Sequence, residues 1–221
     1  MSHPQPDGYL ALPPSVEGDG VLVLHAWWGL NEAIRSVCTR LSQSGFVAFA
    51  PDLYHGKVAK TIPEAEALAG EIDANHVQAE AEVAAAAALL SERVGRSERG
   101  LAVVAFSLGC YYALRLADGD PERVRSVVLF YGTDGGAGGD FRNAKAAYLG
   151  HFAEHDPYET HANVDRLEGT LKGRGHPVTF YHYSGTGHWF FEPDRTDAFN
   201  QAAADLAWER TLAFLKRPVK A

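Results

Sequence analysis

One stretch of the sequence decides the fold: residues 101–114, which read LAVVAFSLGCYYAL. The first six of these residues form a continuous apolar run, typical of a strand that is buried on both faces of a sheet. A predicted helix follows over residues 107–117. The junction therefore predicts a strand that turns directly into a helix, with Ser107 at the turn.

The rest of the chain repeats this alternation of apolar bursts and longer amphipathic stretches. The other predicted strands cover residues 9–12, 21–25, 46–50, 126–131, 146–152 and 178–183. The other predicted helices begin at the N-cap Asn31 and at the capping box Thr61/Glu64, and cover residues 76–94, 160–172 and 194–216. Strands that alternate with helices imply an α/β fold, a mostly parallel doubly wound sheet with helices on both faces. We expect one domain over residues 1–221.

Composition excludes several classes of protein. The 221 residues are 46% hydrophobic and 22% charged, which is ordinary for a globular protein. The 20 Lys and Arg residues against 28 Asp and Glu residues give a net charge of −8, so we expect neither nucleic acid nor an anionic membrane as a partner. No apolar run has the length of a membrane span or a signal-peptide core. With only Cys38 and Cys110, we expect a cytoplasmic protein with free thiols, and nothing demands more than a monomer.

Ser107 has the sequence surroundings of a nucleophile. The pentapeptide Ala105-Phe106-Ser107-Leu108-Gly109 differs at one position from the Gly-x-Ser-x-Gly elbow. That motif needs small residues two before and two after the serine, because the strand-to-helix turn is too tight for larger side chains. The free N–H groups of the helix N-terminus also favour negative charge that develops near the serine. The alternative is that Ser107 only caps the helix.

Two further strand ends carry the residue types that a serine nucleophile needs. Asp156 and His188 each follow a predicted strand, and the order Ser107, Asp156, His188 is the chain order of α/β-hydrolases. We expect His188 to take the Ser107 proton, and Asp156 to fix the histidine tautomer and stabilise the imidazolium. Asp140 and Asp165 are alternatives for the acid, but Asp156 directly follows a buried strand.

Acyl transfer also needs two backbone N–H groups that stabilise an oxyanion. Leu108, the residue after the predicted nucleophile, supplies one of them. The loop HAWWGLN at residues 25–31 supplies the other, and Trp27 is the predicted donor. We expect the aromatic side chains of Trp28, Trp189 and Phe190 to line the substrate pocket. For Trp27 and Trp28 the alternative is plain core packing.

Five segments together resemble the dienelactone hydrolase family within the α/β-hydrolase fold. They are VLVLHAWWGLN (21–31), GFVAFAPDLYHG (45–56), VVAFSLGCYYAL (103–114), YLGHFAEHDPYE (148–159) and YHYSGTGHWFF (181–191). The resemblance covers residues 9–216 and implies hydrolysis of small-molecule esters or lactones through an acyl-enzyme, without a cofactor or a metal. Residue by residue, it implies Ser107 as nucleophile, Asp156 and His188 as its triad partners, and Trp27 and Leu108 as oxyanion donors.

Two positions depart from the family pattern. Well-known members carry cysteine at the position of Ser107, and a glutamate at the position of Ala26 that is linked to management of the thiol. A serine activated by an adjacent histidine has no such need, so the two departures are consistent and predict a serine-nucleophile member. Dienelactone carries a carboxylate that arginines bind in those enzymes, whereas here Arg195 is the first arginine after His188. We therefore expect small neutral esters or lactones as substrates.

Three other hypotheses compete with that of a serine hydrolase. Cys110 is a rival nucleophile, but it lies about 300° around the predicted helix from Ser107. A metal-dependent hydrolase could use His151, His155 and His161, but an i, i+4 pair converges on a metal only on a helix, and His151 belongs to a predicted strand. A non-catalytic binding protein with this fold is the third, and labelling by a fluorophosphonate separates it from an esterase.

Overall fold

Seven strands form one sheet in the order β1-β3-β2-β4-β5-β6-β7 in the computed structural model, which describes residues 6–95 and 100–217. The strands are β1 (Gly8–Ala11), β2 (Gly20–Leu24), β3 (Val47–Pro51), β4 (Leu101–Phe106), β5 (Val124–Phe130), β6 (Ala147–His155) and β7 (Val178–Gly187). Strand β1 pairs antiparallel with β3 at one edge, and the other neighbours pair in parallel. The predicted mostly parallel sheet is confirmed.

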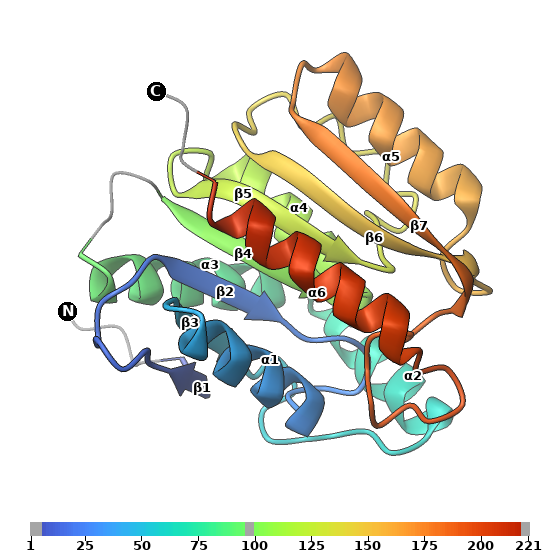
Figure 1. Ribbon diagram of the computed structural model, residues 1–221, viewed down its shortest axis with the longest axis horizontal. Coiled ribbons are helices and arrows are strands. Elements are labelled where there is room, and N and C mark those ends of the chain that lie inside the picture. Colours follow the sequence, from blue (N-terminus) through green and yellow to red (C-terminus); the bar gives the residue numbers. More distant parts are fainter. Residues whose placement is uncertain (1–5, 96–99, 218–221) are drawn as a thin grey trace.

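Helices cover both faces of this sheet (Figure 1). They are α1 (Glu32–Gln43), α2 (Ile62–Ala74), α3 (His76–Arg93), α4 (Leu108–Gly119), α5 (His161–Gly173) and α6 (Gln201–Leu215). In Figure 1, α1 and α6 lie in front of the sheet, and α3 and α4 lie behind it. The sheet is thus doubly wound, and the carboxyl ends of its parallel strands share one edge.

Local chemistry explains where several helices begin. The Asn31 side chain accepts a hydrogen bond from the Ile34 N–H at 3.1 Å, and a capping box joins Thr61 to Glu64 at the start of α2, both as predicted. Helix α6 begins at Gln201 and not near residue 194, because Asn200 caps it and the preceding residues fold into turns. The prediction placed this helix boundary wrongly.

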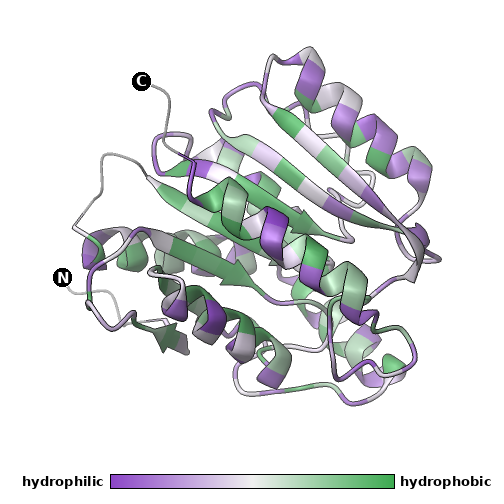
Figure 2. Ribbon diagram, viewed as in Figure 1, coloured by the Kyte–Doolittle hydropathy of each residue, from purple (hydrophilic) through white to green (hydrophobic). Residues whose placement is uncertain are grey.

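The central strands are buried along their whole length. Every residue of β2 and β4 is buried, and both strands are green, that is hydrophobic, in Figure 2. In the edge strand β7, hydrophobic residues alternate with more polar ones. Strands covered on both faces bury apolar side chains on both faces. The strand ends that face the site are therefore held by a close-packed interior.

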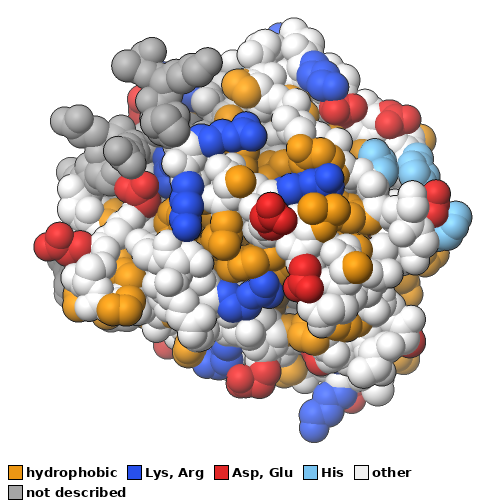
Figure 3. All heavy atoms as spheres, in the orientation of Figure 1, with side chains coloured by type: hydrophobic (Ala, Val, Ile, Leu, Met, Phe, Trp, Pro, Cys, Tyr) orange, Lys and Arg blue, Asp and Glu red, His pale blue; other side chains and the backbone are white. Residues whose placement is uncertain are grey.

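The surface mixes charges of both signs. On the face in Figure 3, Lys and Arg side chains are interspersed with Asp and Glu side chains. The Arg40 guanidinium lies 4.1 Å from the centre of the Trp208 ring, which joins α1 to α6 across this face. In residues 6–95 and 100–217, no helix is long and apolar enough to cross a bilayer.

Candidate active site

Ser107 lies in a strained turn between β4 and α4. Its backbone has φ 48° and ψ −115°, a region that non-glycine residues rarely adopt. The turn is closely packed, because a Cβ added at Gly109 would lie 2.7 Å from Leu24 O, and one added at Gly132 would lie 2.4 Å from Ser107 O. These two glycines let the neighbouring backbones approach the serine and present its hydroxyl at the end of the sheet.

The three residues of the predicted triad meet in one chain of hydrogen bonds. Ser107 Oγ is 2.9 Å from His188 Nε2, and Asp156 Oδ2 is 2.7 Å from His188 Nδ1. Asp156 directly follows β6 and His188 directly follows β7, and their side chains are 3% and 4% exposed. Asp156 Oδ1 accepts hydrogen bonds from the N–H groups of Tyr158 and Glu159, both at 2.9 Å. These bonds fix the carboxylate so that its other oxygen faces the imidazole.

The two predicted oxyanion donors, Trp27 and Leu108, line the same cavity as Ser107. Leu108 is the first residue of α4, so its N–H has no acceptor inside the helix. Trp27 lies in the turn after β2, which is closed by a hydrogen bond from the Gly29 N–H to Ala26 O at 3.1 Å. Neither amide donates a hydrogen bond to another described residue, so both are available to an oxygen in the cavity.

His25 holds the peptide unit that carries the Trp27 N–H. The Leu53 N–H donates to His25 Nε2 at 3.3 Å, so Nδ1 carries the proton and donates to Ala26 O at 2.8 Å. Burial lowers the pKa of His25 and keeps the ring neutral, as this arrangement requires. Because Ala26 O and the Trp27 N–H belong to one peptide plane, the bond from His25 fixes the direction of that N–H.

A cavity of about 610 Å³ opens beside the triad. It is lined by Trp27, Asp73, His76, Ser107, Leu108, Tyr111, Tyr131, Gly132, Thr133, Asp134, Gly135, Gly136, Ala137, Tyr158, Glu159 and His188. Its wall comes from the strand ends, from the junction of α2 and α3, and from the glycine-rich loop after β5. This size and position suit a small-molecule substrate that reaches the serine hydroxyl.

The predicted pocket wall is wrong. Trp28, Trp189 and Phe190 are buried and do not line this cavity. The Trp28 ring packs edge-on against the Trp189 ring at 5.2 Å, and the Arg195 guanidinium covers it at 4.0 Å. Phe190 packs 5.0 Å from the Tyr183 ring. The loop after His188 folds back over the core, so its aromatic side chains point away from the substrate space.

The cavity is acidic. Its lining includes Asp73, Asp134 and Glu159, and it has no Lys or Arg side chain within the described ranges. Burial would raise the pKa of Asp134, but hydrogen bonds from the Arg166 guanidinium, at 2.6 Å, and from glycine N–H groups of its own loop outweigh burial and lower it. Arg195 is held by Asp194 and the Trp28 ring. Among the described residues, no arginine lines the cavity where a substrate carboxylate would lie.

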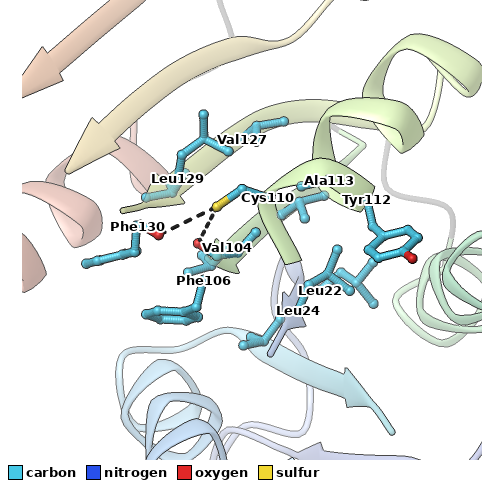
Figure 4. Close-up of a cluster of buried hydrophobic side chains, with 14 of the residues drawn as sticks. Leu22, Leu24, Val104, Phe106, Cys110, Tyr112, Ala113, Val127, Leu129 and Phe130 are labelled. Carbon is cyan, nitrogen blue, oxygen red and sulfur yellow. Dashed lines mark hydrogen bonds between the residues drawn. The ribbon is translucent and has the colours of Figure 1, made fainter. Parts of the chain in front are cut away.

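Cys110 is buried and does not line the cavity. Figure 4 shows its sulfur directed at backbone oxygens, with Phe130 O at 3.6 Å and Ala105 O at 3.4 Å. The residue is fully buried, and burial raises the pKa of its thiol well above the usual range. A protonated, inaccessible thiol is a poor nucleophile, so the geometry favours Ser107 over Cys110.

The three histidines considered for a metal do not converge. His151 is buried within β6, where its two ring nitrogens contact Tyr183 Oη at 2.8 Å and Thr211 Oγ1 at 3.0 Å. His161 Nε2 lies 2.8 Å from Glu154 O, and His155 is exposed at the end of β6. In the described part of the chain, no group of three or more His, Cys, Asp or Glu side chains is placed to hold a metal ion.

Several lining residues escaped the sequence analysis. Tyr131 follows β5 at the same sheet edge as the triad, whereas the prediction included it in the strand, so its place at the end of an apolar burst was a usable signal. Tyr158 and Glu159 lie two and three residues after Asp156, within the segment that carried the family resemblance. Asp73 and His76, at the junction of α2 and α3, carry no local signal, because only the folding of these helices over the sheet brings them to the cavity.

Comparison with known proteins agrees with this architecture. The family model described as the dienelactone hydrolase family matches residues 7–219. "Protein usf" of Aquifex pyrophilus is 32% identical over 213 residues, which cover 95% of this chain and 92% of that protein. A "Putative carboxymethylenebutenolidase" of Aquifex aeolicus is 30% identical over 217 residues, 96% of this chain and 94% of its own.

A solved structure supports the fold. A dienelactone hydrolase-like promiscuous phosphotriesterase from metagenomic libraries superposes with a TM-score of 0.83 at 18% identity, over 94% of this chain and 90% of that chain. At this level of identity the likeness concerns the arrangement of the backbone. Together with the seven-stranded sheet, it identifies the architecture as the α/β-hydrolase fold.

Proposed function

The chain belongs to the dienelactone hydrolase family, and on that premise we propose that it hydrolyses small carboxylic esters or lactones with Ser107 as nucleophile. One observation carries the proposal: the continuous chain of hydrogen bonds from Ser107 Oγ through the His188 ring to Asp156. A serine, a base and a group that orients the base, all within hydrogen-bond reach, are the requirement for nucleophilic acyl transfer.

In the acylation half of the proposed reaction, Ser107 Oγ attacks the carbonyl carbon of the ester or lactone. His188 Nε2 takes the hydroxyl proton, and the Asp156 carboxylate stabilises the imidazolium through Nδ1–H. The negative charge on the former carbonyl oxygen is stabilised by the N–H groups of Trp27 and Leu108. The tetrahedral intermediate then collapses, the C–O bond to the leaving alkoxide breaks, and His188 donates its proton to that oxygen.

Deacylation repeats these steps with water as the nucleophile. His188 takes a proton from the water, the hydroxide adds to the acyl carbon, and the same two N–H groups stabilise the oxyanion. The bond between the acyl carbon and Ser107 Oγ then breaks, and the serine recovers its proton from His188. The transfers between Ser107 and His188 use side chains already in hydrogen-bond contact.

A fluorophosphonate tests the proposal directly. Such a probe phosphonylates an activated serine Oγ and releases fluoride, so it reports the nucleophile without knowledge of the natural substrate. We expect single-site labelling of the wild type, none of Ser107→Ala, and a fall in esterase activity of about 10³-fold or more in that variant. A folded wild type that neither labels nor hydrolyses aryl acetates would point to a binding protein, and labelling of Ser107→Ala at one site would assign another nucleophile.

A further inference from the structure

Tyr131 and Glu192 form a buried hydrogen-bonded pair beside the triad. Tyr131 follows β5 with φ 40°, a strained backbone conformation for a tyrosine, and its side chain is fully buried. Its hydroxyl donates a hydrogen bond to Glu192 Oε1 at 2.8 Å. Glu192 is 1% exposed, and no described residue contacts its Oε2 through a hydrogen bond. The mechanism above uses neither residue.

This pair links the two segments whose distance the reaction depends on. The centre of the Tyr131 ring lies 4.9 Å from that of the His188 ring, so the phenol packs against the base. The next residue is Gly132, whose Cα packs against the Ser107 carbonyl. Glu192 lies four residues beyond His188, in a turn closed by its own N–H and Trp189 O at 2.9 Å. The Tyr131–Glu192 bond therefore ties the loop that carries His188 to the strand end beside Ser107.

We propose that Tyr131 and Glu192 are positioning residues that hold the His188 imidazole at hydrogen-bond distance from Ser107 Oγ. This inference rests on the proposed function. The Tyr131 ring limits the tilt of the imidazole, and the bond to Glu192 fixes the ring. A displacement of about 1 Å in a reacting group is enough to cost about 10²-fold in rate, so one bond of this kind is kinetically visible.

The protonation state of Glu192 affects how well this pair holds the loop that carries His188. Burial raises its pKa to about 8, with Asp194 acting in the same direction and the Tyr131 hydroxyl and Arg195 opposing. Arg40 of α1 borders the same narrow crevice from the opposite side. At neutral pH the group is thus an uncharged acid, which suits a closed apolar setting. Above pH 8 a buried carboxylate forms there, and the cost of its desolvation opposes the packing of Glu192 against Tyr131.

The test compares rates of fluorophosphonate labelling and aryl acetate turnover in matched variants. Tyr131→Phe removes the hydroxyl and keeps the ring, Glu192→Leu removes the acceptor, and Glu192→Gln keeps an acceptor oxygen without the titration. Tyr148→Phe is the control, because the Tyr148 hydroxyl is buried without a hydrogen-bond partner in the described structure and lies outside the cavity. Circular dichroism and the unfolding midpoint establish that each variant is folded.

We expect Tyr131→Phe and Glu192→Leu each to lower the labelling rate and kcat by about tenfold, with KM little changed. The labelling rate and kcat of the double variant should be no lower than those of the worse single variant, because both substitutions remove the same hydrogen bond. We expect the labelling rate and kcat of the wild type to decline above pH 8. Those of Glu192→Gln should stay within about threefold of the wild type at pH 7 and show no such decline. Tyr148→Phe should match the wild type.

Two results separate failure of this inference from failure of the proposed function. If the wild type, Tyr131→Phe and Glu192→Leu are all labelled at the same rate, the positioning role is overturned. The assignment of Ser107 as nucleophile then still stands. Glu192→Gln that declines above pH 8 as the wild type does would also overturn the role of the Glu192 charge. A folded wild type that does not label overturns the proposed function itself.

Discussion

Strained residues gather at the site. Ser107, Tyr131 and Trp189 are non-glycine residues with φ of 48°, 40° and 64°, and each lies within two residues of the end of a strand. Such conformations cost free energy and persist where the surrounding packing fixes them. Here the three residues surround His188. The backbone thus departs from its preferred conformations where the Ser107 hydroxyl, the Tyr131 phenol and the His188 imidazole meet.

The glycine at position 109 gives a prediction at this scale. Gly109→Ala places a Cβ within 2.8 Å of two backbone oxygens, Leu24 O and His25 O, which cannot move as a side chain can. We expect a loss of about 1–3 kcal/mol in the free energy of unfolding and slower fluorophosphonate labelling, because α4 is pushed away from β2. The measurement is urea unfolding followed by fluorescence.

Gly169→Ala is the matched control. Gly169 lies within α5, and a Cβ there meets no atom within 4 Å. The free energy of unfolding of that variant should rise by about 0.5–1 kcal/mol, since alanine is the better helix former. Its rate of fluorophosphonate labelling should equal that of the wild type. An unchanged unfolding free energy in Gly109→Ala would contradict the close approach of α4 and β2.

At the scale of elements, the strand ends were readable and the cavity wall was not. Apolar bursts place Asp156 and His188 at the sheet edge with little ambiguity, and Asn31 and Thr61 mark helix starts through their side-chain oxygens. Trp28 illustrates the limit: aromatic residues next to a predicted site serve the core or the pocket equally well, and only the path of the loop after β7 decides. Long-range packing of this kind leaves no periodic signal in the chain.

The loop between β7 and α6 carries a pH-dependent contribution to stability. Glu192 has a pKa of about 8 when folded against an ordinary value of 4.5, so between these values the unfolded chain releases its proton and the folded chain keeps it. The folded state then binds more protons, and the free energy of unfolding falls as pH rises from 4.5 to 8, by at most about 1.4 kcal/mol per pH unit. Above pH 8 the contribution is constant.

Glu192→Gln removes this titration while keeping an acceptor for Tyr131. We expect the difference in unfolding free energy between the variant and the wild type to shift in favour of the variant from pH 4.5 to 8, and then to level off. Urea unfolding of both proteins across pH 4–9 measures it. A difference that stays constant across this range would mean that Glu192 is ionised in the folded protein at neutral pH.

At the scale of the whole molecule, the distribution of charge leads to a prediction about the substrates of the proposed esterase. The chain carries a formal net charge of −8, and the exposed Asp73 adds a negative charge at the cavity, whereas Asp134 is paired with Arg166 and burial raises the pKa of Glu159. Three described arginines are engaged by other groups: Arg142 by Asp140, Arg166 by Asp134, and Arg195 by Asp194 and the Trp28 ring. No Lys or Arg side chain of the described ranges lines the cavity. A substrate carboxylate would thus lose its hydration without gaining a cationic partner.

We therefore expect a neutral aryl acetate to exceed its carboxylate-bearing analogue in kcat/KM by about tenfold or more, which corresponds to about 1.4 kcal/mol in transition-state free energy. Part of this gap is long-range repulsion, so it should narrow as salt is added. Asp73→Asn, at an exposed lining position outside the triad, should narrow it further with little change for the neutral ester. Steady-state kinetics of both esters at low and high salt measure the effect. A tenfold preference for the anion that fades with salt would mean that an arginine reaches the bound substrate, and would restore a carboxylate-bearing lactone as the natural class.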